Sequence, residues 1–111
     1  MAQYKRVGRI IRLKPEAYIR YKQYHENCWD EVLESGKSIG IRNYSIYYKE
    51  GLLFSYYEIP ADITSEQLSR HWSENPKCVE WEKIMHTMQM PFGTPTGDIW
   101  WEDMEEVFHQ D

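Results

Sequence analysis

The sequence has few cysteines and no long hydrophobic run. Cys28 and Cys78 are its only cysteines among 111 residues, and neither has a CxxC partner. We expect both to be buried free thiols rather than a disulfide or a redox motif. No apolar run approaches the roughly 18 residues that span a bilayer, and the first residues are too charged for a signal-peptide core. These absences favour a cytoplasmic protein without a membrane anchor.

An excess of positive charge and the common nucleotide and metal motifs are also missing. Thirteen basic and 18 acidic side chains give a net charge of -5, which argues against nucleic acid as a partner. There is no glycine-rich phosphate loop and no nucleophile motif around a serine or cysteine. Glu106 and His109 would have the spacing of a di-iron pair only on a helix, whereas we expect a strand there. His71 and His86 lack ligand-spaced neighbours, so no metal site is expected.

Aromatic residues are what the sequence has in excess. It contains nine tyrosines and five tryptophans, well above ordinary usage. With 41% apolar and 28% charged residues, the composition is otherwise that of a soluble globular protein. A chain of this length can bury its own core, so we expect one domain over residues 1–111.

The residue patterns predict an alternation of strands and helices. In order, we expect a strand at 7–13, a helix from 18 to 33 that stops at Gly36, strands at 41–48 and 52–59, helices at 64–75 and from 76 onward, and a strand at 104–109. Lys49-Glu50-Gly51 fits a tight hairpin, and Thr64 with Gln67 fits a capping box. Residues 90–98 are expected to form an irregular loop because they are rich in turn residues.

This order is the split β-α-β arrangement of ferredoxin-like α+β folds, in which helices cover one face of an antiparallel sheet. The other face must also be covered. In so short a chain, a second copy or the aromatic C-terminal segment can cover it, so we expect a homodimer with two-fold symmetry, a dimeric α+β barrel.

The first helix carries a histidine among aromatic residues. Because residues four apart on a helix are neighbours, Tyr21, His25 and Trp29 should project toward one surface. An imidazole beside phenols can transfer protons to a bound ligand. The alternative is a core histidine whose nitrogens are satisfied by the backbone.

Several short motifs spread over most of the chain occur in a distinctive order and spacing. They are Lys14-Pro15, Tyr21-x-x-x-His25-x-x-x-Trp29, Asn43-Tyr44-x-Ile46-Tyr47, Leu52-Leu53-Phe54, Glu58-Ile59, Cys78-x-x-Trp81-x-x-x-Met85 and Glu106-Val107-Phe108-His109. Together they resemble the L-rhamnose mutarotase family. These enzymes need no cofactor, interconvert the anomers of a sugar, and have a ferredoxin-like fold that dimerises. The resemblance implies the same properties here, with a monosaccharide as substrate.

The resemblance also implies roles for individual residues. His25 matches the family's proton donor, and Tyr21 and Tyr44 match tyrosines that contact the substrate. Trp81 matches the first member of a Trp-Trp pair that lines the sugar site, but the second member is Glu82 here. The family's Asn-Pro-Asp motif is also replaced. L-rhamnose is the default substrate of the family, and these departures leave L-fucose or a related deoxy-hexose as the alternative.

Mutarotation needs one group to protonate the ring oxygen and another to take the proton of the anomeric hydroxyl. His25, with an ordinary pKa of about 6.5, can serve in either direction. Tyr21, Tyr44 or Glu82 can supply the second group, and we interpret the tyrosines as binders and Glu82 as a candidate base. Trp81 can offer a platform for the sugar, or be a core residue, and Tyr44 can be a cross-strand packing residue.

A second hypothesis belongs to a different class. The chain could be a non-catalytic, or haem- or small-ligand-binding, dimeric α+β barrel whose aromatic residues only line a pocket. Fold does not distinguish the two, because this architecture hosts unrelated functions. The sequence also leaves open whether Trp100-Trp101 closes its own site or that of a second copy.

Overall fold

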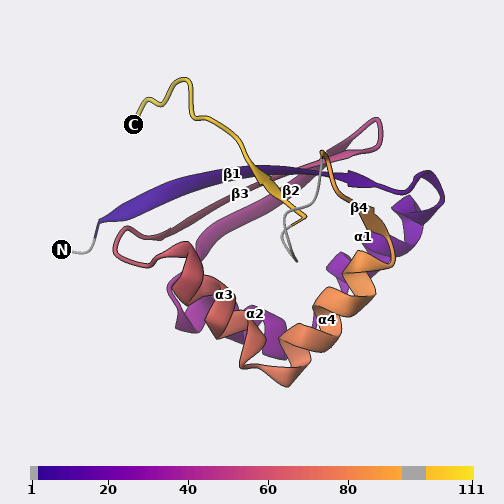
Figure 1. Ribbon diagram of the computed structural model, residues 1–111, viewed down its shortest axis with the longest axis horizontal. Helices are drawn as coiled ribbons and strands as arrows, with labels where there is room; N and C mark the ends of the chain where they lie inside the picture. Colours follow the sequence, from indigo (N-terminus) through magenta and orange to yellow (C-terminus); the bar gives the residue numbers. More distant parts are fainter. Residues whose placement is uncertain (1–2, 94–99) are drawn as a thin grey trace.

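The computed structural model describes residues 3–93 and 100–111 (Figure 1). Its elements are β1 (Tyr4–Leu13), the short 3-10 turn η1 (Pro15–Ala17), α1 (Tyr18–Glu26), α2 (Asp30–Ser38), β2 (Arg42–Lys49), β3 (Leu52–Pro60), α3 (Ser65–Ser73), α4 (Pro76–His86), β4 (Gln89–Met90) and β5 (Glu102–Asp103). No helix among these residues is long and apolar enough to cross a bilayer.

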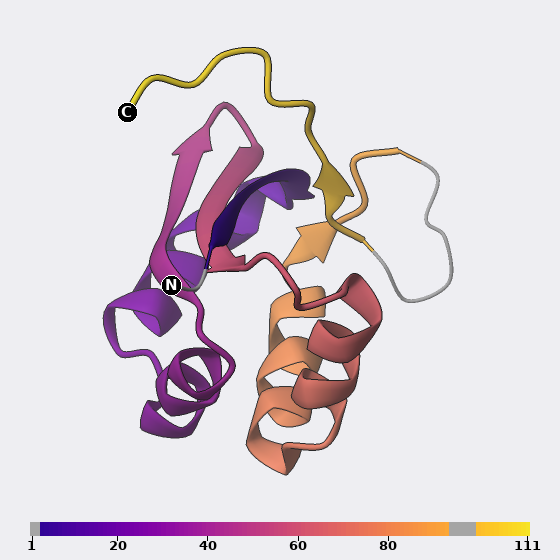
Figure 2. The same cartoon turned by 90° about the vertical axis from the view of Figure 1, so that its left-hand side faces the viewer.

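The strands form one antiparallel sheet in the order β2-β3-β1-β4, with β5 also paired to β1. The two central strands are therefore β1 and β3, as in ferredoxin-like folds. The sheet is curled, and the helices of the described residues lie along its concave side (Figures 1 and 2). The expected fold class, a ferredoxin-like antiparallel sheet with helices on one face, is confirmed.

Local backbone and side-chain interactions form the expected hairpin turn and the expected N-terminus of α3. Glu50 and Gly51, both with positive φ, connect β2 to β3 as a two-residue hairpin turn. The Thr64 hydroxyl accepts from the Gln67 backbone N–H at 3.1 Å, and the Gln67 side-chain oxygen accepts from the Thr64 N–H at 2.8 Å. The predicted hairpin and capping box are both confirmed.

The prediction of one helix from Tyr18 to Leu33 is wrong, because the segment folds as α1 and α2 with a break after Glu26. The backbone N–H and the side-chain amide of Asn27 both donate to the carbonyl of Gln23, at 3.2 and 3.1 Å, and this ends α1. Gly36 does not end the second helix. Gly40 does so at φ +93°, with the Ile41 N–H donating to the Gly36 carbonyl, a glycine C-cap.

The predicted strand at 104–109 is also wrong. Of the described residues from 100 onward, only those of β5, residues 102–103, pair with β1 as a strand. The chain beyond β5 is attached by a Met104 N–H to Gly8 carbonyl bond and an Arg6–Glu106 ion pair. The alternating pattern of a strand needs an apolar surface for one of its faces. This chain offers none there, and Val107 and Phe108 remain 90% and 79% exposed. In the loop expected at 90–98, Met90 belongs to β4, and residues 94–99 lie outside the described part.

Two apolar clusters lie between sheet and helices. The first, which we call the aromatic cluster, contains Ile11, Leu13, Ala17, Tyr21, Leu53, Trp81, Met85 and Met88. The second, the aliphatic cluster, contains Tyr57, Ile59 and Leu68. Between them Arg9 and Ser55 face each other in the β1–β3 register, and Ser55 is buried. The middle of the helix-facing surface is therefore polar, with an apolar cluster on either side.

Candidate functional site

Tyr21, His25 and Trp29 meet around a fourth aromatic residue, Trp81 of α4. The Tyr21 and His25 rings lie 4.3 Å apart between centroids, and the His25 and Trp29 rings lie 5.4 and 5.3 Å from Trp81. Trp29 reaches this position from the N-cap of α2 rather than from α1. The predicted grouping is therefore present, although its helical origin is only partly as expected. Trp81 is itself buried, so it belongs to the core as well as to this group.

His25 has one ring nitrogen engaged and the other available. Its Nδ1 lies 2.9 Å from the backbone carbonyl of Tyr21, which can only accept, so Nδ1 carries a proton. Among the described residues Nε2 has no hydrogen-bond partner. Burial lowers the pKa of His25, and the bond to Tyr21 partly opposes this shift. The resting imidazole is therefore a neutral base whose free lone pair is on Nε2.

The two tyrosines expected to contact the substrate come from opposite sides of the space. Tyr21 is buried on α1, and its hydroxyl accepts from the Gln89 side-chain amide at 3.1 Å. Tyr44 lies on the helix-facing side of β2, with its ring 5.2 Å from that of Tyr57. Burial of both hydroxyls raises their pKa, and the charges of Glu82 and Arg9 also act on Tyr44. Although 49% of Tyr44 is exposed, burial is the leading cause of the rise in its pKa. Both remain neutral phenols that can donate.

Glu82 follows Trp81 on α4 and brings a carboxyl group to the same region. Its Oε2 lies 3.6 Å from Nε2 of His86, whose ring stacks on Trp100 at 4.2 Å and 13°. Enclosure by surrounding atoms raises the pKa of Glu82, and His86 opposes the rise. Because 53% of the side chain still contacts solvent, a ligand can reach it. The sequence suggested no role for His86, and the spacing of four residues from Glu82 was the available signal.

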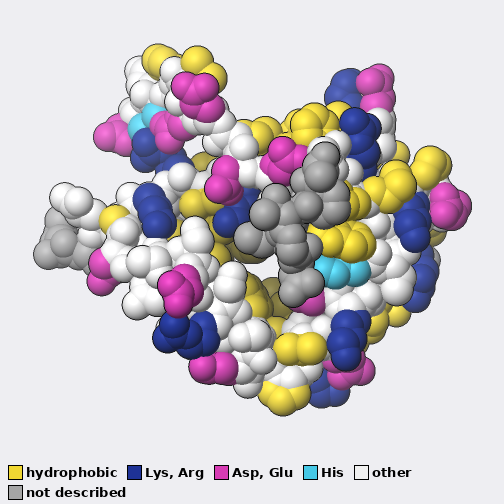
Figure 3. Space-filling view, in the orientation of Figure 1, with side chains coloured by type: hydrophobic (Ala, Val, Ile, Leu, Met, Phe, Trp, Pro, Cys, Tyr) yellow, Lys and Arg dark blue, Asp and Glu magenta, His cyan; other side chains and the backbone are white. Residues whose placement is uncertain are grey.

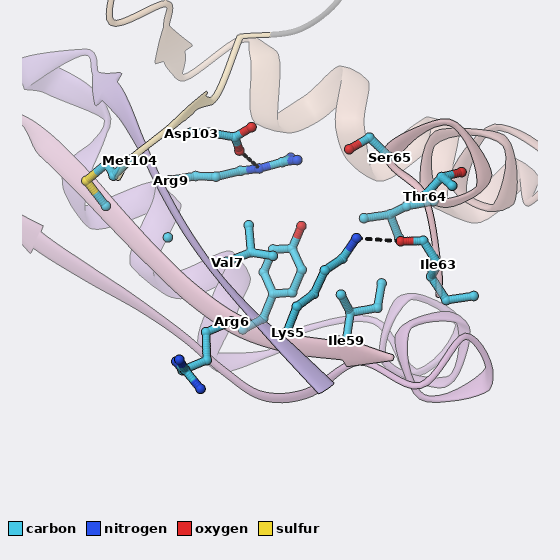
Figure 4. Close-up of a pocket in the computed structure, with 13 residues that line it drawn as sticks. Lys5, Arg6, Val7, Arg9, Ile59, Ile63, Thr64, Ser65, Asp103 and Met104 are labelled. Atoms are coloured by element: carbon cyan, nitrogen blue, oxygen red, sulfur yellow. Dashed lines mark hydrogen bonds and ion pairs between the residues drawn. The ribbon is translucent and has the colours of Figure 1, made fainter. Parts of the chain in front are cut away.

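A separate cavity of about 230 Å³ lies on the far side of Tyr57, between the first half of β1 and the start of α3 (Figure 4). Arg9 extends along it and donates to Asp103 at 2.8 Å, while Lys5 donates to the carbonyl of Ile63 at 2.7 Å. None of the five predicted site residues, Tyr21, His25, Tyr44, Trp81 and Glu82, lines this cavity.

Tyr57 links the two regions, because it lines the cavity and packs on Tyr44. The space-filling view shows the molecule hollowed between sheet and helices (Figure 3). Sequence reasoning missed Arg9. The signal was a charge at an inward position of an otherwise apolar alternation, between Val7 and Ile11.

The site thus combines a neutral imidazole and a phenol beside an indole, with Glu82 and Tyr44 near enough to interact with Tyr21 through charge. Within residues 3–93 and 100–111 no group of three or more His, Cys, Asp or Glu side chains is arranged to hold a metal ion. The two cysteines are free, Cys78 buried and Cys28 partly buried. The described groups can donate, accept and transfer protons, which suits a reaction that moves protons between oxygen atoms.

A family model for L-rhamnose mutarotase matches residues 6–110. The chain belongs to this family. It is 31% identical to L-rhamnose mutarotase of Lactiplantibacillus plantarum, over 96% of this chain and 98% of that one. The corresponding enzyme of Bacillus subtilis is 32% identical over 96% and 99% of the two chains. A crystal structure of L-rhamnose mutarotase from Formosa agariphila has the same fold, with a TM-score of 0.75, 21% identity, and coverage of 96% and 99%.

Membership of the L-rhamnose mutarotase family confirms the resemblance inferred from the short motifs. It favours the enzymatic hypothesis over the ligand-binding barrel, since the relatives named above are mutarotases. Family membership does not establish the roles of individual residues. Those roles stay predictions for Tyr21, His25, Tyr44, Trp81 and Glu82.

Proposed function

We propose that this member of the L-rhamnose mutarotase family interconverts the α and β anomers of L-rhamnose or a related deoxy-hexose by general acid/base catalysis. The observation that carries the proposal is the state of His25. Its Nδ1 is fixed by the Tyr21 carbonyl, and its Nε2 has no partner among the described residues in a cluster of aromatic rings. Such a nitrogen is oriented for proton exchange with a ligand rather than satisfied by packing.

The reaction opens and recloses the sugar ring. One group protonates the ring oxygen while another takes the proton of the anomeric hydroxyl, the bond from the ring oxygen to the anomeric carbon breaks, and an open-chain aldehyde forms. Rotation about the adjacent carbon–carbon bond then lets the hydroxyl attack the other face of the aldehyde, and both protons return. No atoms are gained or lost, so an acid and a base suffice.

His25 and Glu82 are the groups that we assign to these transfers. Burial lowers the pKa of the imidazole from its ordinary 6.5 and raises that of the carboxyl from its ordinary 4.5. The two pKa values therefore move toward each other. This suits a reaction that must run in both directions, because acid and base exchange roles between them.

The remaining predicted residues would bind and orient the sugar. Tyr21 and Tyr44 offer neutral hydroxyls from opposite sides of the space, and sugar hydroxyls need such partners. Trp81 is 6% exposed, so we assign it a wall of the site and the support of His25 rather than an open stacking platform.

We also propose that the protein is a homodimer. Tyr47 is 65% exposed on β2, and Val107 and Phe108 extend from the domain almost uncovered. Exposed apolar groups of this kind mark an interaction surface, and the second copy expected from the sequence would cover them. Sedimentation at twice the monomer mass supports this assignment, and a monomer at micromolar concentration contradicts it. The free cysteines fit a reducing compartment, so we propose a cytoplasmic location.

The activity is tested by magnetisation transfer between the two anomeric proton signals of a sugar in NMR. Wild-type protein should accelerate exchange of L-rhamnose above the buffer rate, with L-fucose as the alternative substrate and D-glucose as the comparison. Heat-denatured protein provides the control for buffer catalysis. Exchange at the buffer rate for all three sugars would rule out the proposed function.

A further inference from the structure

Gln89 is a buried polar residue that was not singled out from the sequence and has no role in the proposed mechanism. It lies in β4 directly opposite Leu13 of β1, and opposed residues of an antiparallel pair project to the same face. Leu13 belongs to the aromatic cluster, so Gln89 also points between sheet and helices. Only 3% of the residue is exposed, and its Nε2 donates to the Tyr21 hydroxyl at 3.1 Å.

The other end of this amide is unsatisfied. Oε1 of Gln89 is buried and has no hydrogen-bond partner among the described residues. Buried polar atoms in folded proteins are nearly always paired, because an unpaired one forfeits its bonds to water. Turning the amide by 180° does not remove the problem, since one end would still face Tyr21 and the other would still lack a partner.

We propose that Gln89 is a sugar-binding residue whose free amide end bonds a hydroxyl of the substrate. The inference rests on the proposed function and adds a contact to the same site. Nε2 donates to the Tyr21 hydroxyl oxygen, so the phenolic hydrogen is left to donate elsewhere. Tyr21 and Gln89 thus present a donor beside an acceptor. That pair is complementary to two neighbouring sugar oxygens, one accepting from Tyr21 and one donating to Gln89.

The arrangement makes Gln89 a specificity-determining residue. A sugar that has a hydroxyl at this position satisfies the free oxygen, whereas the corresponding deoxy-sugar leaves it unpaired. Sites built to hydrogen-bond a hydroxyl reject analogues without it far more strongly than apolar pockets reject an added group. We therefore expect one hydroxyl of the preferred sugar to be indispensable for binding.

Gln89→Met tests the proposal, because methionine has a similar length and volume but no hydrogen-bonding amide. The KM for the sugar that wild type turns over should rise about tenfold to hundredfold, the range for a lost buried hydrogen bond that leaves its partner unpaired. The melting temperature without sugar should change little, because removal of the unsatisfied oxygen offsets the loss of the bond from Nε2 to the Tyr21 hydroxyl. Gln23→Met, the same change on the exposed side of α1, should alter neither quantity.

The outcomes separate the two proposals. A variant with wild-type KM and a lowered melting temperature would assign Gln89 to packing and overturn this inference, leaving the activity in place. Wild-type protein without activity on any sugar would overturn both. If Gln89→Met does not fold, Gln89→Leu is assayed. A panel of mono-deoxy sugars gives a second readout, because the variant should lose discrimination at a single position while wild type keeps it, and equal discrimination by both would contradict the proposal.

Discussion

The aromatic and aliphatic clusters lie on the same face of the sheet, but the polar groups near them differ in whether they have hydrogen-bond partners. Near the aliphatic cluster, the charges that line the cavity are already matched, Arg9 by Asp103 and Lys5 by the Ile63 carbonyl. At the aromatic cluster, Nε2 of His25 and the amide oxygen of Gln89 have no hydrogen-bond partner among the described residues. Matched groups hold segments together, whereas enclosed and unmatched groups are ready for a ligand. This difference is the reason we propose that the chemistry takes place at the aromatic end.

Burial is the leading cause of the pKa shifts at the aromatic end, and it acts there on both an acid and a base. It lowers the pKa of His25 and raises that of Glu82. Glu58, on the outer side of β3, shows the opposite case. Its pKa falls to about 2 because Tyr56, Arg42 and Asn43 donate to its carboxylate. A carboxylate stabilised in this way is a poor base, whereas groups such as His25 and Glu82, whose charged forms are disfavoured, are candidates for catalysis.

The largest expected effect is on activity at the aromatic end. His25→Gln keeps a polar side chain of similar size but cannot exchange a proton, so the rate of anomer exchange should fall about 10²- to 10⁴-fold. His71→Gln is the matched control, because His71 bonds Ser35 and Ser38 away from this cluster. Its exchange rate should stay at the wild-type value. If His25→Gln keeps wild-type activity, His25 is a packing residue, and the proposed chemical difference between the two clusters is wrong.

A pair of truncations compares the clusters directly. Trp81→Ala should lower the free energy of unfolding by about 3–5 kcal/mol and Leu68→Ala by about 2–5 kcal/mol, since both side chains are buried. Only the first should also raise the KM for the sugar. Urea denaturation and anomer-exchange kinetics at low temperature measure the two quantities. If Leu68→Ala raises KM as much as Trp81→Ala does, general loosening of the domain explains both results.

Sequence reasoning succeeded where the chemistry is local. The Thr64 capping box and the Glu50-Gly51 turn depend on neighbours within a few residues, and the order of elements sufficed for the fold class. The break after Glu26 was missed because one side chain, Asn27, competes for a helix carbonyl in a segment whose apolar pattern continues.

The residues of the candidate site also fall into those that local sequence could indicate and those that it could not. The grouping of Tyr21 with His25 was predicted from the sequence because the two residues lie one turn apart on α1. Gln89 and Arg9 were missed because their surroundings come from distant segments. The burial of Gln89 depends on the pairing of β4 with β1, and Arg9 is placed by β3 and Asp103. Spacing along a chain does not report such pairings, and these are the residues that distinguish the two ends of the face.

The smallest effect is a pH dependence that sharpens the comparison. In the unfolded chain His25 titrates near its ordinary pKa of 6.5, whereas burial lowers its pKa in the folded protein. As the pH falls below about 6.5, the unfolded state binds this proton first, and the free energy of unfolding decreases. The contribution is present above the ordinary pKa and is lost as the pH falls through the folded one.

His25→Gln should therefore lose less stability than wild type between pH 7.5 and pH 5.5, measured by urea denaturation. The other histidines are common to both proteins, so the difference isolates His25. The raised pKa of Glu82 acts in the opposite direction, because protonation then favours the folded state as the pH falls toward its ordinary 4.5. Keeping to pH 5.5 and above limits that contribution. If both proteins lose the same free energy of unfolding over this range, His25 has the same pKa in the folded and unfolded states. The burial effect that we assign to His25 would then be absent.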